Sequence, residues 1–335
     1  MRTDDIASAQ EATAEATIRP SLTQFINLSK YAYTSGKTPF SHALEKELGY
    51  EPLKVDGHLV KRYSEADGFY GQAFISTGAG PKQVIVAFEG TNIHNPPSKE
   101  FQQAQIAADV DIFDGVAAQS FADALTFTRR AIRAAAKAGV SRSETFVTGH
   151  SLGAAQAEFA SSYTGLGGTT FGTPGLSTTI TGKHTHAALF NYVDEGDPVG
   201  NYASDKPDHL GPIVQSPSIV HVGDTHLVGD AWHAKFLEDA AKLYAEHKFD
   251  KDVEAAFILA ASADHFHPLA NYAQDLHQTL YGPDRTQGSG SKFFEPIDPL
   301  SGVLSTPHAD QHTIASLHSH GAGFGGGGFF GHLGL

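Results

Sequence analysis

Residues 144–155, ETFVTGHSLGAA, place a strand, a sharp turn and a helix in immediate succession, and this stretch constrains the fold more than any other. Its β-branched and aromatic first half predicts a strand that runs directly into the GHSLG pentapeptide at residues 149–153. A GxSxG pentapeptide between a strand and a helix is a nucleophile elbow, which holds a serine hydroxyl above a sheet. Gly149 and Gly153 are expected because a Cβ there would meet the neighbouring strand or helix. The stretch predicts an α/β fold with Ser151 as candidate nucleophile.

The composition narrows the classes of partner. Of 335 residues, 40% are hydrophobic and 18% are charged, as is ordinary for a globular protein. A net charge of −14 argues against nucleic acid or an anionic membrane surface as a partner. The sequence has no cysteine, which excludes disulfides, thiol catalysis and thiolate metal sites. Neutral and apolar substrates are compatible with this composition.

The apolar run Val84–Phe88 predicts a central strand that is covered on both faces. It ends at the sequence Glu-Gly-Thr. In an α/β-hydrolase, a loop after an early strand supplies one N–H group of the oxyanion hole, and the residue after the nucleophile supplies the other. This assigns Thr91 and Leu152 as the donors. For Thr91, a plain strand-end turn is the alternative.

A polar segment, residues 92–114, follows this strand. Segments of this length inside a compact domain often serve as lids or binding elements, so we interpret it as a candidate lid. An ordinary surface excursion is the alternative. Residues 116–138 then show one apolar stripe at helical spacing and end before Gly139, which predicts a helix that returns the chain to the sheet.

Two further strands, expected at residues 168–171 and 187–193, lead to the remaining candidates. A Ser–His pair needs a carboxylate after a later strand. Asp197 fits this position, and Asp194 is the local competitor. A histidine beyond the last strand can accept the serine proton, and both His265 and His267 qualify by position.

Residues 201–230 are expected to be a long, loop-rich excursion, followed by helices at 232–249 and 252–261. Four histidines there match no compact ligand pattern such as HExxH, so they are assigned to the surface or to local hydrogen bonds. They are His209, His221, His226 and His233. No metal site and no cofactor are predicted.

Five ordered motifs resemble the class 3 lipases, the group of the filamentous-fungal triacylglycerol lipases and related bacterial esterases. The resemblance spans roughly residues 21–276. The motifs are VAFEGT at 86–91, TGHSLGAA at 148–155, FGTP at 171–174, residues 191–199 and HPLANY at 267–272. The last is similar to the family's pattern of His, then Leu or Met, then Tyr, which favours His267 over His265.

The resemblance implies a carboxylic-ester hydrolase that cleaves lipid-like esters such as acylglycerols through an acyl-enzyme. It implies that Ser151 is the nucleophile, Asp197 the orienting carboxylate and His267 the base, with Thr91 and Leu152 as the oxyanion donors. A small-molecule ester and a lipid–water interface are the partners it suggests. No oligomeric state is predicted.

The chain departs from the family at Glu89, where an arginine is usual, and this reverses a charge near the oxyanion loop. Because the extracellular fungal members use disulfides, a chain without cysteine looks closer to the bacterial branch. A phospholipid sn-1 ester, as in a phospholipase A1, or a polyester is the alternative substrate. A hydrolase fold retained as a non-catalytic binding module is the alternative from a different class.

The expected organisation is a disordered leader at residues 1–20, an α/β-hydrolase domain at 21–282, with a mostly parallel central sheet flanked by helices, and a Gly/His-rich tail at 283–335. The leader has no apolar segment of a secretory signal. No stretch reaches the ~18 apolar residues of a membrane span. We therefore expect export by a route without an N-terminal signal, or a cytoplasmic location. The tail is expected to be disordered, with a C-terminal export signal as the alternative.

Overall fold

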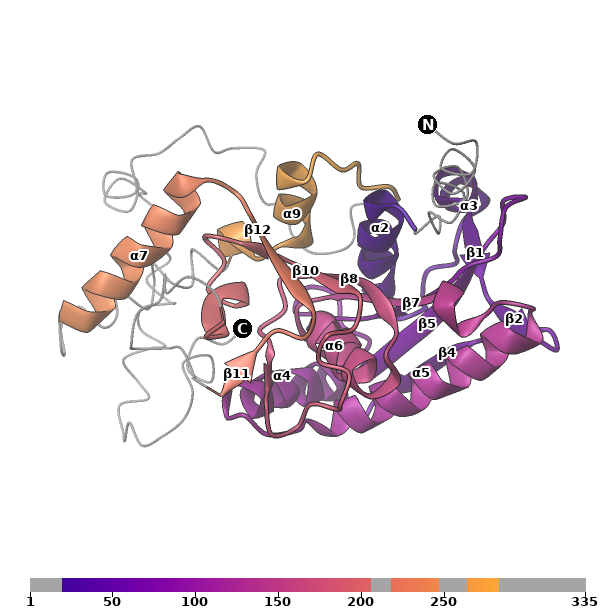
Figure 1. The fold of residues 1–335 in the computed structure, drawn as a ribbon, viewed down its shortest axis with the longest axis horizontal. Helices are drawn as coiled ribbons and strands as arrows, with labels where there is room; N and C mark the ends of the chain where they lie inside the picture. The colour runs from indigo at the N-terminus through magenta and orange to yellow at the C-terminus, as the bar shows by residue number, and fades with distance from the viewer. Residues whose placement is uncertain (1–19, 206–217, 247–263, 283–335) are drawn as a thin grey trace, which may run out of the picture.

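An eight-stranded sheet forms the centre of the protein (Figure 1). The computed structural model describes residues 20–205, 218–246 and 264–282. The strand order is β1-β5-β6-β7-β8-β10-β12, with β4 beside β5. Neighbours from β6 to β12 are parallel, whereas β1, β4 and β5 join antiparallel at one edge. The predicted mostly parallel sheet is therefore confirmed.

The strands of this sheet are short, as is usual in a mixed α/β domain. They are β1 (Tyr50–Pro52), β4 (Lys61–Ser64), β5 (Phe69–Ser76), β6 (Val84–Phe88), β7 (Thr145–His150), β8 (Gly167–Phe171), β10 (Leu189–Asp194) and β12 (Asp224–Val228). Two small ladders lie outside it, β2 (Lys54–Val55) with β3 (His58–Leu59) and β9 (Leu176–Ser177) with β11 (Ile219–Val220).

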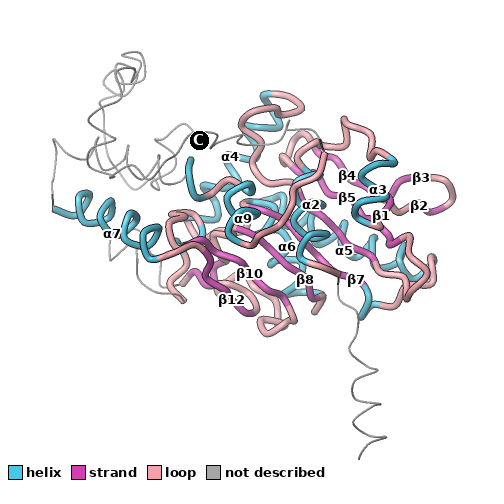
Figure 2. Tube along the Cα trace, turned by 90° about the horizontal axis from the view of Figure 1, so that it is seen from above, coloured by secondary structure: helices cyan, strands magenta, loops and turns pink. Residues whose placement is uncertain are grey.

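Helices cover both faces of the sheet, as Figure 2 shows from above. Strand β6 explains why: Val84, Val86 and Phe88 face one apolar cluster, and Ile85 and Ala87 face the other. The first cluster is completed by α5 (Gln119–Lys137) and α6 (Leu152–Thr164), and the second by α2 (Leu22–Ala32) and α9 (Leu269–Asp275). Because every residue of this strand is buried, its unbroken apolar sequence is accounted for.

Helix α2 begins at a capping box formed by Ser21 and Gln24. The same helix is tied to the last described segment of the chain. Thr23 Oγ1 donates to Gln278 Oε1 at 2.6 Å, Asn27 Nδ2 donates to the Thr279 carbonyl at 2.8 Å, and the Tyr281 amide donates to Asn27 Oδ1 at 2.6 Å. The two ends of the α/β domain are therefore fastened to each other.

The remaining helices are α3 (His42–Leu48), α4 (Lys99–Phe113) and α7 (Ala231–Glu246), with short 3₁₀ turns at Arg142–Glu144 and Gly200–Tyr202. Among the helices of the described residues, none combines the length and the apolar character that crossing a membrane requires.

Two segments differ from the sequence-based expectation. The candidate lid, residues 92–114, is mostly the helix α4, because Ser98 caps it and Phe101, Gln105, Ala108 and Ile112 supply a buried face at helical spacing. The expected loop at 201–230 contains β12, which extends the central sheet beside β10. The alternation of polar and apolar residues along β12 is weak because it is an edge strand with no buried residue.

Several expectations fall outside the described residues. These are the leader apart from Pro20, the tail at 283–335, the helix expected at 252–261 and the position of His209.

Candidate active site

Ser151 stands at the junction of β7 and α6, with φ 58° and ψ −129°. Such strain costs a non-glycine residue about 1–3 kcal/mol, and it is the backbone signature of a nucleophile elbow. Neighbouring backbone leaves no room for side chains beside it. A Cβ at Gly149 would overlap the Gly153 carbonyl oxygen, and one at Gly153 would lie 2.5 Å from the carbonyl oxygen of Phe88. The expected need for glycine at both positions is confirmed.

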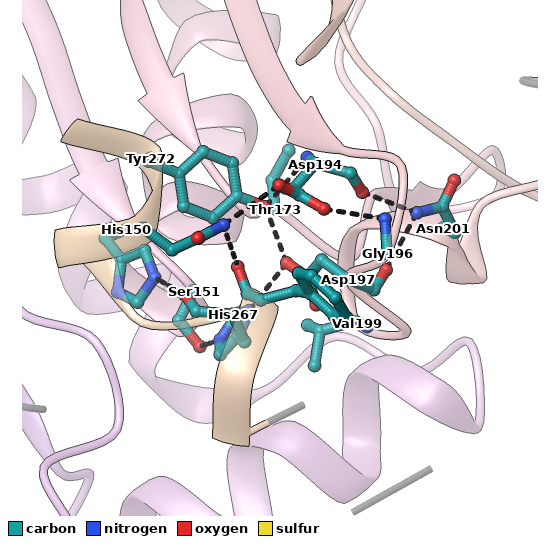
Figure 3. A network of polar contacts seen from close by, with 12 residues as sticks. His150, Ser151, Thr173, Asp194, Gly196, Asp197, Val199, Asn201, His267 and Tyr272 are labelled. Carbon is teal, nitrogen blue, oxygen red and sulfur yellow. Dashed lines mark hydrogen bonds and ion pairs between the residues drawn. The ribbon is translucent and has the colours of Figure 1, made fainter. Parts of the chain in front are cut away.

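Ser151, His267 and Asp197 meet beyond the carboxyl ends of the parallel strands (Figure 3). Ser151 follows β7, Asp197 lies in the turn after β10, and His267 precedes α9. The Ser151 hydroxyl donates to His267 Nε2 at 2.8 Å, and His267 Nδ1–H donates to Asp197 Oδ2 at 2.8 Å. In this geometry an imidazole can take the serine proton while a carboxylate fixes the ring. Ser151 is only 9% exposed.

Asp197 is completely buried yet holds its charge. Burial alone would raise its pKa, but the charge of His267 and hydrogen bonds from His267, Tyr272 and Val199 outweigh burial and lower that pKa. The Tyr272 hydroxyl donates to Oδ2 at 2.6 Å, and the Val199 amide donates to Oδ1 at 2.8 Å. The ionised carboxylate in turn selects the tautomer of His267 whose Nε2 faces Ser151.

The competing residues point elsewhere. Asp194 Oδ2 accepts from His233 Nδ1 at 2.9 Å and from Asn271 Nδ2 at 2.9 Å, and its Oδ1 accepts from the Gly196 amide at 2.6 Å. The ring of His265 packs on Phe266 with centroids 4.6 Å apart. The structure therefore brings Asp197 and His267, rather than Asp194 or His265, to Ser151.

Asp194, His233 and Asp275 form the group of described residues whose metal-ligating atoms come together, within 4.8 Å of one another. Asp194 already accepts N–H bonds from His233, Asn271 and the backbone, as a hydrogen-bonded carboxylate does. The hydrogen bond to Asp194 raises the pKa of His233 even though burial opposes the shift. We interpret the contact between Asp194 and His233 as an ion pair, in keeping with the local hydrogen bonding that was expected for His233.

The expected oxyanion donors lie on two segments that pack on the elbow. Leu152 is the first residue of α6, so its N–H is among those that a helix leaves without an intrahelical partner. The loop with Thr91 can lie close to the elbow because Gly90 has no side chain: a Cβ there would lie 2.5 Å from the His150 carbonyl oxygen. The Thr91 hydroxyl also donates to Asp109 Oδ2 on α4 at 2.6 Å, which joins the candidate lid to this loop.

Two carboxyl groups near this loop have raised pKa values. Burial raises the pKa of Asp109 to about 7, against the opposing effects of the Thr91 hydrogen bond and of His267. Burial also raises the pKa of Glu89 to about 8. Ser35 Oγ and Asn92 Nδ2 donate to the Glu89 carboxyl at 2.7 and 2.9 Å. A buried carboxyl with a raised pKa thus occupies the position where the resemblance to the class 3 lipases led us to expect an arginine.

Two residues of the site were given no role from the sequence. Tyr272 belongs to the HPLANY motif, and its contact with Asp197 is the physical reason for a tyrosine there. His150 is the variable residue of the GHSLG pentapeptide, and its Nε2 lies 2.7 Å from the His267 carbonyl oxygen. Each stands inside a motif, but the contacts join residues far apart in the chain and leave no local pattern.

The comparisons with known proteins bear on this site. The model of the Tle-like phospholipase domain, described as phospholipase-like, matches residues 25–222, which include Ser151 and Asp197. No curated protein matches the sequence significantly. Among solved structures, the extracellular lipase LipA from Serratia marcescens is similar, with 15% identity and a TM-score of 0.37. The match covers 54% of this chain and 40% of that lipase, so the chain spans less than half of its length.

The resemblance read from the sequence is confirmed at the level of a phospholipase-like family, and membership of class 3 stays a prediction. The family model covers more than half of the 335 residues and contains the elbow. The protein therefore belongs to the family of Tle-like phospholipase domains.

Proposed function

We propose that the protein is a serine hydrolase that cleaves carboxylic esters of lipids through an acyl-enzyme on Ser151. The observation that carries the proposal is the line of hydrogen bonds from Asp197 through His267 to Ser151, set on a strained elbow. Membership of a phospholipase-like family supports a hydrolase of lipid esters as the general class of activity. We put the acyl esters of glycerophospholipids first as substrates and acylglycerols second.

In the acylation step, His267 Nε2 takes the Ser151 proton while Oγ attacks the ester carbonyl carbon. Asp197 stabilises the imidazolium that forms. As the tetrahedral intermediate collapses, the imidazolium donates its proton to the leaving alcohol, here a lysophospholipid or a partial glyceride. A water molecule, deprotonated by His267, then attacks the acyl-enzyme and releases the fatty acid.

The developing negative charge needs donors aimed at the carbonyl oxygen. The backbone N–H groups of Leu152 and Thr91 are the donors that we propose, and the loss of one such donor typically costs ~3 kcal/mol of barrier. The raised pKa of Glu89 supports this role for the loop, because an ionised carboxylate there would disfavour an oxyanion.

The test is hydrolysis of zwitterionic phosphatidylcholine vesicles and of triacylglycerol emulsions by the wild type and by Ser151→Ala. Zwitterionic lipid is chosen because the net charge of −14 opposes binding to an anionic surface. We expect fatty acid and lysophospholipid from the wild type and neither from Ser151→Ala. Ser143→Ala, which makes the same change at an exposed serine, should match the wild type.

Release of the phosphorylated head group instead of fatty acid would contradict cleavage of the acyl ester. A folded wild type that hydrolyses no ester but still binds the vesicles would favour the binding module. If the triacylglycerol emulsion is hydrolysed faster than the phospholipid, the order of substrates that we propose is reversed while the chemistry stands.

A further inference from the structure

His150 lies next to His267, the proposed general base, and no step of the proposed mechanism uses it. Its side chain is 0% exposed. Its ring lies beside that of His267, with centroids 4.8 Å apart and a tilt of 34°. Its Nε2 is 2.7 Å from the carbonyl oxygen of His267, which Figure 3 shows beside it. Its Nδ1 is 2.6 Å from the Tyr33 hydroxyl.

These two contacts define the tautomer. A carbonyl oxygen only accepts hydrogen bonds, so Nε2 of His150 must carry a proton and donate it to the His267 carbonyl. Burial, reinforced by the neighbouring His267, lowers the pKa of His150 to about 3, so the ring has one proton. Nδ1 is therefore an acceptor, and the Tyr33 hydroxyl donates to it.

The main chain at His267 needs such a bond. His267 stands at a bend just before Pro268, outside any helix or strand, so no ladder fixes its carbonyl. His150 is the last residue of the buried strand β7 and directly precedes Ser151. The hydrogen bond from His150 therefore ties the backbone of the base to the strand that carries the nucleophile.

Tyr33 extends this connection to the oxyanion loop. It caps the C-terminus of α2, and its hydroxyl fills the space that a Cβ at Gly90 would need. The Tyr33 carbonyl also accepts from Asn92 Nδ2 at 2.9 Å. One tyrosine thus contacts the loop that holds Thr91 and the histidine that holds the base.

We propose that His150 is a positioning residue, whose Nε2–H holds the main-chain carbonyl of His267 and so sets the base against Ser151, with Tyr33 holding His150 in that tautomer. The proposal rests on the proposed function, because His267 is taken as the base. A neutral His150 is also required on electrostatic grounds: His267 becomes an imidazolium during acylation, and a second positive ring at 4.8 Å would oppose it.

The test compares His150→Phe, which keeps an aromatic ring but removes both nitrogens, with His150→Gln, whose side-chain amide can again donate to the carbonyl. Misplacement of a reacting group by about 1 Å costs up to about 10²-fold, so we expect His150→Phe to lower kcat about 10- to 100-fold with little change in KM. His150→Gln should recover most of this loss. Tyr33→Phe should give an intermediate loss, and His226→Phe, at an exposed histidine of β12, none.

Three readouts separate positioning from a structural role. The first is the acid limb of the pH profile of kcat/KM, which reports the base. The second is the low-field proton resonance of the hydrogen bond between His267 and Asp197. The third is the rate at which a fluorophosphonate labels Ser151. All three should change in His150→Phe and return in His150→Gln, whereas a structural role would change only the melting temperature.

A folded His150→Phe variant with wild-type kcat, labelling rate and low-field resonance would overturn the proposal. If that variant does not fold, Tyr33→Phe and His150→Asn decide, since Asn can accept from Tyr33 but is too short to reach the carbonyl; wild-type rates in both would overturn it as well. Labelling of Ser151 needs no lipid. A wild type that is labelled but hydrolyses no ester would therefore refute the proposed function alone, and the labelling ratios would still test His150.

Discussion

Asp194 and Asp197 share one turn, but only Asp197 faces the imidazole of His267. His267 contacts the Asp197 carboxylate and contributes most to lowering its pKa, and a tyrosine hydroxyl and a backbone amide that donate to the same carboxylate add to this effect. Asp194 instead pairs with His233 at the start of α7. Spacing along the sequence does not separate them, because one ends the strand β10 and the other follows it by three residues, and an aspartate favours a turn at either position.

Asp197→Asn is expected to leave the fold intact and to lower kcat by about 10⁴, as in the triad precedent, because the amide favours the wrong tautomer of His267. Steady-state kinetics on a soluble ester would measure the loss, and circular dichroism would check the fold. Asp194→Asn provides the matched variant with a smaller expected effect on kcat. If Asp197→Asn keeps its activity and Asp194→Asn loses it, the two assignments exchange.

The residues that the sequence predicted best are those inside motifs. Ser151 and the two elbow glycines follow from local sterics, so a pentapeptide identifies them. Selecting His267 over His265 required the resemblance to a family. Tyr33 could not be predicted, because its bond to His150 joins residues 117 positions apart and depends on how α2 lies across the sheet.

At the scale of elements, the strands with two buried faces were predicted, and the edge strand β12 was not. The unbroken apolar run of β6 predicts a buried strand, whereas β12 is short, mostly polar and flanked by glycines. Helix α4 was missed for a related reason: its exposed face is polar and its buried face includes Gln105, whose amide bonds to the Gly90 carbonyl and the Asn92 amide. A search for hydrophobic residues at helical spacing does not detect a buried position that is occupied by a glutamine.

The packing of α6 on the sheet depends on the absence of a side chain at position 153. In Gly153→Ala the new Cβ would lie 2.5 Å from the Phe88 carbonyl oxygen, and backbone must move to admit it. Overpacking of this kind costs about 1–3 kcal/mol, so urea denaturation should show a lower free energy of unfolding. Gly80→Ala has open space around its Cβ and serves as the control. Equal stability of the two variants would contradict the close approach.

At the scale of the whole molecule, the buried titratable groups make stability depend on pH in two directions. The pKa of Glu89 is raised from 4.5 to about 8, and that of Asp109 from 3.8 to about 7, so in those windows the folded protein holds protons that the unfolded chain has released. The free energy of unfolding therefore falls as pH rises through them. His150 acts oppositely, because its pKa falls from 6.5 to about 3 and the unfolded chain binds the extra proton there.

Glu89→Gln isolates one of these contributions. The amide keeps the shape and cannot ionise, so the variant should lack a fall in unfolding free energy of up to about 1.4 kcal/mol per pH unit between pH 4.5 and 8. Urea denaturation of both proteins across that window measures the difference. Glu47→Gln makes the same change at an exposed glutamate and should keep the wild-type slope. Parallel curves for wild type and Glu89→Gln would show that Glu89 stays ionised in the folded protein.

The bonds between α2 and residues 278–281 have a consequence for how the protein is made. Helix α2 leaves the ribosome early, but the residues that fasten it, and His267 just before them, leave late. A nascent chain that has already formed its elbow has a serine without a base. On the mechanism that we propose, ester hydrolysis therefore requires that synthesis has passed the last of these residues.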